Sequence, residues 1–218
     1  MFPSKINYSD FGLTIFLRFP LLVFAVLFSS QAFALECFDT DASLPEGVDS
    51  ETGFRMERYR APVPESIPGG CIAGNNEVKA AYLKAIENNS TDNWVFLDVF
   101  PPRGLGHDPL DGEWIISEEH SYIPGSTWLP EVGRGFIEEE HQQYFQQNLQ
   151  KLTGNDTETP VVFYCTADCW QSWNAAVRAI SWGYSNVIWY PEGIDGWLEI
   201  GLELEPAVPI NFFAHLDE

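Results

Sequence analysis

The chain has 218 residues, with 32 acidic and 11 basic side chains and a formal net charge of −21 at pH 7. So acidic a chain repels nucleic acid and anionic membrane surfaces, and we expect neither as a partner. The length suffices to bury a full hydrophobic core within one domain.

The first 34 residues have the pattern of a secretory signal peptide. Lys5 and Arg18 precede the apolar run 19–28, which is too short to span a bilayer. Ala32-Phe33-Ala34 fits the small-x-small cleavage rule, so we expect cleavage after Ala34. The mature chain would be periplasmic or secreted, without stable membrane insertion. Its net charge would be −22, because the leader holds two basic residues and one acidic residue.

The rest of the chain divides into an arm, a domain and a tail. Residues 35–70 are rich in Pro, Glu, Asp and Gly and lack periodicity, which predicts an irregular N-terminal arm. The domain is expected over residues 71–205, and a C-terminal tail over residues 206–218.

Strands and helices alternate along the expected domain. Strands are predicted at 70–73, 94–99, within 123–130, at 160–164 and at 186–190. Helices are predicted to start at Asn75 or Asn76 and to cover 138–152 and 171–182, with a turn at 88–93 and a long loop at 101–118. This alternation predicts an α/β fold, in which helices cover both faces of a mostly parallel five-stranded sheet.

The loop that follows the strand at 160–164 carries the main chemical signal. Cys165 comes directly after the strand, and Cys169 precedes a helix. Ligand sites in parallel sheets lie beyond the carboxyl ends of the strands, and loop amides and a helix N-terminus there favour a thiolate. We therefore expect Cys165 to be the reactive thiol and Cys169 its partner. The intervening and following loop residues are Thr166, Ala167, Asp168, Trp170 and Gln171.

Four cysteines in an exported chain indicate disulfides. The simplest pairing joins Cys37 to Cys71 as a structural staple and leaves Cys165 and Cys169 for chemistry. Three connectivities are open, and a static structural disulfide in the loop is an alternative to a functional pair.

Three further residues are candidates for a supporting role around the loop. Asp98 ends a strand near the same sheet edge, although strand-end acids often cap a neighbouring loop instead. His120 is the best placed of the four histidines, although a surface histidine with no ligand role is the simpler interpretation. Trp170 suits a lid that excludes water from the sulfurs, and Trp173 lies one turn further on; core packing is the alternative for both.

Several motifs together resemble the rhodanese (sulfurtransferase) domain over about 125 residues. They are Asp98-Val99, His120-x-x-Ile-Pro-Gly125, the Cys165 loop and its helix, Gly183-Tyr184-x-Asn186-Val187, and Gly193-x-x-Gly196-Trp197. More narrowly, the Cys-x-x-x-Cys-Trp loop, Tyr59–Pro64, Trp128-Leu129-Pro130 and Trp189-Tyr190-Pro191 resemble the PQQ-dependent catabolism-associated CXXCW motif protein family. That resemblance implies association with periplasmic alcohol oxidation, with a quinoprotein dehydrogenase or cytochrome c as partner. The rhodanese resemblance implies a persulfide on Cys165.

The loop departs from the usual rhodanese pattern. It has no Gly and no Arg, it carries Asp168, and Arg178 lies two turns into the helix, out of reach. A carboxylate opposes both a thiolate and an anionic substrate. We therefore expect no ordinary thiosulfate sulfurtransferase activity.

Three functions fit these residues. The first is a thiol-redox or sulfur-handling accessory to PQQ-dependent alcohol catabolism, which uses Cys165 and Cys169 to exchange electrons. The second is a module that binds or delivers Cu(I) or another thiophilic metal through the two cysteines, with His120 as a third donor. The third is a non-catalytic domain whose acidic surface docks a dehydrogenase or cytochrome.

Overall fold

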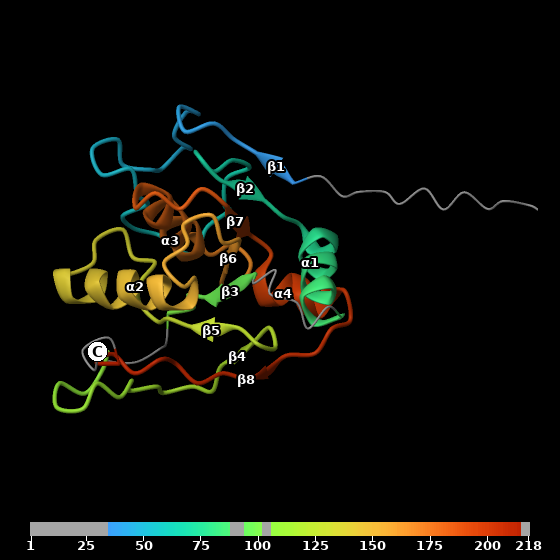
Figure 1. The fold of residues 1–218 in the computed structure, drawn as a ribbon. Helices are drawn as coiled ribbons and strands as arrows, with labels where there is room; N and C mark the ends of the chain where they lie inside the picture. Colours follow the sequence, from blue (N-terminus) through green and yellow to red (C-terminus); the bar gives the residue numbers. More distant parts are fainter. Residues whose placement is uncertain (1–34, 88–93, 102–105, 215–218) are drawn as a thin grey trace, which may run out of the picture. The chain divides into compact units, whose positions relative to one another are not determined.

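A computed structural model describes residues 35–87, 94–101 and 106–214 (Figure 1). The expected signal peptide, the expected 88–93 turn and His215 lie outside these ranges. No helix within them is long and apolar enough to cross a bilayer. The elements in chain order are β1 (Glu36–Cys37), β2 (Cys71–Ile72), α1 (Asn75–Glu87), β3 (Val95–Asp98), β4 (Ser121–Tyr122), β5 (Thr127–Trp128), α2 (Glu139–Leu152), β6 (Val161–Tyr164), α3 (Trp170–Ser181), β7 (Val187–Tyr190), α4 (Gly193–Glu199) and β8 (Glu205–Pro206).

The central sheet confirms the predicted α/β class and differs from the prediction by one strand. In the described part of the chain its order is β1-β2-β7-β6-β3-β5, so it has six strands where the sequence predicted five. All neighbours pair in parallel except β1, which pairs antiparallel with β2. The added strand comes from the arm. It has two exposed residues and therefore no apolar run to mark it.

The central strands are buried on both faces, which is why they read as continuous apolar runs. Successive side chains alternate between faces, so Val161 and Phe163 join one core while Val162 and Tyr164 join the other. Helices α2 and α3 cover the first face, and α1 and α4 cover the second (Figure 1). The short helix α4 was not anticipated from the sequence.

The tail packs back onto the domain. β8 pairs antiparallel with β4, and further on Phe212 is buried against the Trp114 and Tyr144 rings. Phe212 also stacks on His107 at 3.7 Å between ring centroids. The long loop that contains His107 and Trp114 is therefore held by an aromatic cluster with the tail.

Candidate functional site

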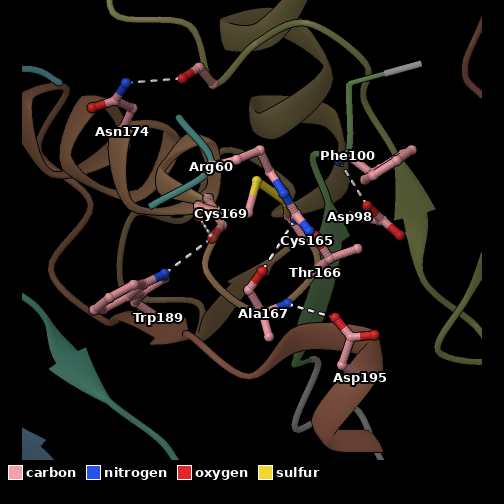
Figure 2. The surroundings of a disulfide bond; sticks show 12 residues. Arg60, Asp98, Phe100, Cys165, Thr166, Ala167, Cys169, Asn174, Trp189 and Asp195 are labelled. Carbon is pink, nitrogen blue, oxygen red and sulfur yellow. Dashed lines mark hydrogen bonds between the residues drawn. A yellow bond between two sulfur atoms is a disulfide. The ribbon is translucent and has the colours of Figure 1, made fainter. Parts of the chain in front are cut away.

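The two loop cysteines are joined to each other. Cys165 directly follows β6, Cys169 is the N-cap of α3, and a disulfide links their sulfurs (Figure 2). Both residues are buried, with exposed fractions of 0 % and 2 %. A second disulfide joins Cys37 and Cys71, which lie opposite each other in the β1–β2 pair.

The backbone of the loop is held from two sides. Asp195 of α4 accepts a hydrogen bond from the Ala167 amide at 2.8 Å, and the Ile194 amide donates to the Cys165 carbonyl at 3.0 Å. On the other side the Trp170 amide donates to the Tyr59 carbonyl at 2.9 Å. Two of the amides that could have pointed at an anion on the sulfur are therefore already occupied.

The N-terminal arm lies across the loop. Its Ala61 amide donates to the Asp168 carbonyl at 3.1 Å. The indole nitrogen of Trp170 donates to the Pro62 carbonyl at 3.0 Å, and that of Trp173 donates to the Ser66 carbonyl at 3.0 Å. Both tryptophans are buried in the core and use their one polar atom to fix the arm. The arm, with Trp170 beneath it, covers this side of the loop.

Arg60 of the N-terminal arm contacts the loop, and the sequence did not predict this residue as part of the site. Its Nη1 donates to the Thr166 hydroxyl and, at 3.1 Å, to the Ala167 carbonyl (Figure 2). The loop carries no basic residue of its own, but a cation from a segment 106 positions earlier in the chain reaches it. The only sequence signal was that Arg60 belongs to the 59–64 stretch of the narrower resemblance, and that signal does not specify a contact.

A cavity of about 510 Å³ lies beside His120, and a smaller one of about 360 Å³ lies beside the disulfide. Of the two cysteines, Cys169 lines the smaller cavity and Cys165 does not. The residues that line it are Tyr59, Arg60, Phe100, Pro101, Thr166, Cys169 and Gln171. Access to the disulfide from this cavity therefore leads to Cys169, whereas the sequence predicts Cys165 as the reactive thiol.

Asp98 and His120 form a buried pair near the same edge of the sheet. Nε2 of His120 lies 2.7 Å from Oδ2 of Asp98, and Oδ1 accepts a hydrogen bond from the Phe100 amide at 2.8 Å. Burial raises the pKa of Asp98, and the hydrogen bond from His120 opposes that shift. The interpretation of His120 as a surface histidine is wrong, because its side chain is only 6 % exposed.

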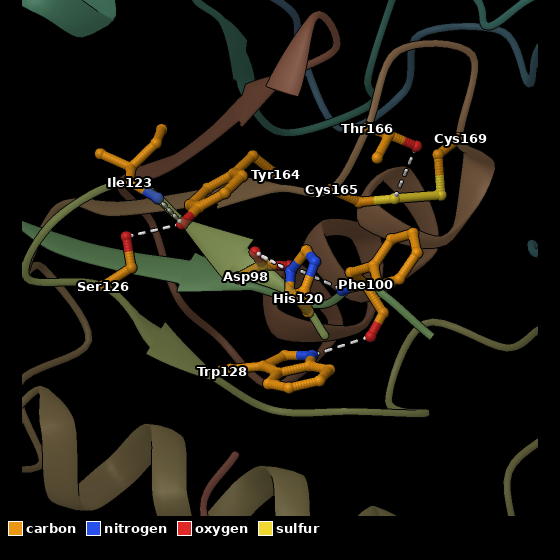
Figure 3. Close-up of polar contacts among 10 residues, drawn as sticks. All are labelled: Asp98, Phe100, His120, Ile123, Ser126, Trp128, Tyr164, Cys165, Thr166 and Cys169. Atoms are coloured by element: carbon orange, nitrogen blue, oxygen red, sulfur yellow. Dashed lines mark hydrogen bonds and ion pairs between the residues drawn. A yellow bond between two sulfur atoms is a disulfide. The ribbon is translucent and has the colours of Figure 1, made fainter. Parts of the chain in front are cut away.

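Phe100 stands between this pair and the disulfide. Its ring lies against the His120 ring (Figure 3), with 4.4 Å between centroids, and Phe100 also lines the cavity that Cys169 borders. Asp98 thus both caps the Phe100 amide and fixes His120. The pair supports the wall of the cavity through Phe100.

A metal centre would need donors beyond the two sulfurs. Within the described ranges no group of three His, Cys, Asp or Glu side chains is positioned to hold a metal ion. Arg178 also lies outside the loop chemistry, as expected. Its guanidinium is buried and donates to the carbonyls of Val132, Arg134 and Gly135.

The family is shown by comparison with known proteins. The rhodanese-like domain model matches residues 80–200, which is more than half of the chain, so the chain belongs to the rhodanese-like domain family. No curated protein matches it.

Two solved structures are similar to this chain. One is an uncharacterized protein from Saccharomyces cerevisiae, 24 % identical, with a TM-score of 0.37; the match covers 60 % of this chain and 92 % of the yeast chain. The other is a variant of EanB in complex with hercynine, 18 % identical, with a TM-score of 0.41; the match covers 63 % of this chain and 32 % of that one.

Proposed function

We propose that this protein is an exported thiol–disulfide redox protein, in which Cys165 and Cys169 cycle between a disulfide and a dithiol. Its rhodanese-like domain indicates sulfur or thiol handling. The observation that carries the proposal is the disulfide between the two cysteines at the carboxyl end of β6, beside a cavity. A rhodanese loop normally presents one sulfur to its substrate, whereas two sulfurs within bonding reach can exchange electrons with a partner thiol.

The exchange balances without any other cofactor. A thiolate attacks one sulfur of the disulfide, and the other sulfur leaves as a thiolate, which gives a mixed disulfide. A second thiolate attacks the bound group and releases it as a disulfide, so two external thiols are oxidised while both cysteines are reduced. The reverse sequence oxidises the protein.

The cellular setting follows from the leader and from the narrower resemblance. Cleavage after Ala34 would place the mature chain in an oxidising compartment, where the Cys37–Cys71 disulfide persists. In this proposal the protein serves PQQ-dependent alcohol oxidation, and its partner is a quinoprotein dehydrogenase or cytochrome c. The mature chain's expected net charge of −22 suits a basic electron carrier.

A thiol titration of the folded protein tests the proposal. Differential alkylation with peptide mapping, which separates the loop pair from the exposed Cys37–Cys71 disulfide, should show that dithiothreitol releases the thiols of Cys165 and Cys169 before the protein unfolds and that oxidised glutathione closes them again. Cys165→Ser and Cys169→Ser variants should lose this reversible step. If the loop disulfide opened only when tryptophan fluorescence reported unfolding, it would be a static structural disulfide and the proposal would fail. Adding Cu(I) to the reduced protein in the same assay tests the metal-binding alternative.

A further inference from the structure

One side chain of the cavity beside Cys169 lacks a partner. Gln171 is only 4 % exposed, and no described residue offers its Oε1 a hydrogen bond. A buried acceptor without a partner is costly, on the order of 1–3 kcal/mol, so such an atom calls for an explanation. Gln171 also lines the cavity, so a rotation of its side chain would bring this buried acceptor to a ligand there, which would supply the missing donor.

Arg60 brings unused donors to the same cavity. Nη1 is engaged with the loop, while Nε and Nη2 make no hydrogen bond to any residue in the described ranges. A guanidinium with free donors is suited to a carboxylate, which accepts two parallel hydrogen bonds. The residues that line the cavity therefore include a cation, a side chain with an unpaired acceptor and one cysteine of the disulfide.

We propose that this cavity binds a small thiol that carries both a carboxylate and an amino or amide N–H group, and that this thiol exchanges with the disulfide at Cys169. Arg60 binds the carboxylate, and Oε1 of Gln171 accepts the N–H. A cavity of about 360 Å³ admits a molecule of amino-acid to tripeptide size. The inference rests on the proposed function and adds the substrate class and the point of attack.

The chemical step has a defined direction. The ligand thiolate attacks Sγ of Cys169, the Cys165–Cys169 bond breaks, and its electron pair leaves on Cys165. The Thr166 hydroxyl, 3.9 Å from Sγ of Cys165, can donate to the new thiolate. A second ligand thiolate then attacks the ligand sulfur of the mixed disulfide and frees Cys169. Two thiols are oxidised to one disulfide, and the protein disulfide accepts the two electrons.

The acidic loop residue does not occupy this cavity. Asp168 is exposed and lines a different hollow, together with Ala167, Pro191 and Glu192. The protein's net charge acts over longer distances and is screened within about 8 Å at 0.15 M salt. Recognition at contact distance therefore depends on Arg60.

Three probes that differ in one group test the assignment. L-Cysteine has a thiol, an amine and a carboxylate; cysteamine lacks the carboxylate, and 3-mercaptopropionate lacks the amine. Each is mixed with the oxidised full-length mature protein at 0.15 M salt, and the rate is expressed per thiolate. Wild-type protein should react with cysteine about tenfold faster than with either of the others, the equivalent of one charge-assisted hydrogen bond. Tandem mass spectrometry of the quenched reaction should place the adduct on Cys169.

Two variants distinguish a loss of ligand recognition from a loosening of the N-terminal arm. Arg60→Gln should remove the advantage of cysteine over cysteamine, whereas a loosened arm would change all three rates together. Gln171→Met should remove the advantage of cysteine over 3-mercaptopropionate without lowering the stability of the free protein, because it deletes an orphaned acceptor. Arg58→Gln is the matched control, since Arg58 is 81 % exposed and lines another hollow.

An adduct on Cys165, equal rates for the three probes, or ratios unchanged by Arg60→Gln would each overturn the inference. Dithiothreitol, which carries no charge, distinguishes this failure from failure of the proposed function. If it reduces the loop disulfide reversibly while the probes show no preference, the redox function stands and the substrate class is wrong. If it cannot open the disulfide in the folded protein, the redox function itself fails.

Discussion

Asp98 accepts a hydrogen bond from His120 across 22 positions of sequence, at 2.7 Å, with both side chains almost completely buried. A buried carboxylate without this partner would be left as an isolated charge, which costs more than the pair itself contributes. The stability of the wall behind the Cys169 cavity thus depends on a polar contact that lies outside the loop.

Asp98→Asn should lower the free energy of unfolding by about 1–2 kcal/mol, because it replaces the charge-assisted hydrogen bond to His120 with a neutral one. The amide keeps the shape of the carboxylate and can still accept from the Phe100 amide, so the loss reports the contact with His120. Urea denaturation at pH 7 measures it. Asp156→Asn is the control, because Asp156 is exposed and caps only the Glu158 amide. Similar losses of unfolding free energy in the two variants would mean that the Asp98–His120 pair does not contribute to stability.

The two disulfides should differ in their contribution to stability. Cys37 and Cys71 are 34 positions apart, whereas Cys165 and Cys169 are four apart. By the chain-entropy relation, replacing the first pair with serine should cost about 4 kcal/mol and replacing the second about 2 kcal/mol. Denaturant midpoints of the two double variants under oxidising conditions provide the comparison. A larger loss from the loop pair would indicate a structural staple at 165–169 and argue against a redox pair.

Acid should destabilise the protein through His107 and His141, whose rings both contact Phe212 in the aromatic cluster. Burial lowers the pKa of both His107 and His141, and their rings lie 5.9 Å apart. For His107, Glu140 and Asp108 oppose the shift; for His141, His107 and Arg134 add to it, while Glu131 and Glu140 oppose it.

The direction of this pH dependence of stability follows from proton uptake on unfolding. Below pH 6.5 the unfolded histidines bind protons that the folded ones do not, so stability falls as pH drops toward the folded pKa values. Each histidine contributes at most about 1.4 kcal/mol per pH unit. Melting temperatures between pH 7 and pH 5 should fall less steeply in the His107→Gln, His141→Gln double variant than in wild type. Parallel curves would contradict the assignment.

Wild-type protein should show negligible thiosulfate:cyanide sulfurtransferase activity. Sγ of Cys169 lies within bonding reach of Cys165, so it can attack a persulfide there, restore the disulfide and release hydrosulfide before cyanide reacts. The Asp168→Gly, Cys169→Ser variant should accumulate the persulfide, visible by intact mass. Glycine suits position 168 because its φ is 55°. Thiocyanate production by the wild type at the rate of an ordinary rhodanese would refute this.

Much of the fold could be predicted because the central strands are buried on both faces. Val161–Tyr164 and Val187–Tyr190 are apolar throughout, and the helices between them repeat at helical spacing. The edge strand β1 gave no such signal, since two exposed residues owe their conformation to β2 and not to their own pattern. Helix α4 is also too short for a periodic signal, with seven residues.

The candidate site was predictable where neighbours in sequence are neighbours in space, and where strand ends such as that of Asp98 share one edge of the sheet. The Cys165–Cys169 loop is local, so its position after a strand and before a helix was visible. Arg60 reaches it from more than a hundred positions away, and no composition or spacing rule encodes that contact. His120 was misjudged for a similar reason: its burial depends on Phe100 and Trp128 from other segments.

The edges of the central sheet bear on where this chain can be shortened. β1 and β2 precede the family-matched segment 80–200, and at the opposite edge the Ile210 amide donates to the Trp128 carbonyl at 3.0 Å. Segments outside residues 80–200 therefore pair with β7 on one side of the sheet and with β5 on the other. Unpaired strand edges recruit other strands, so a fragment of 80–200 alone should self-associate and precipitate. A recombinant version meant to stay dispersed should run from residue 35 to residue 214.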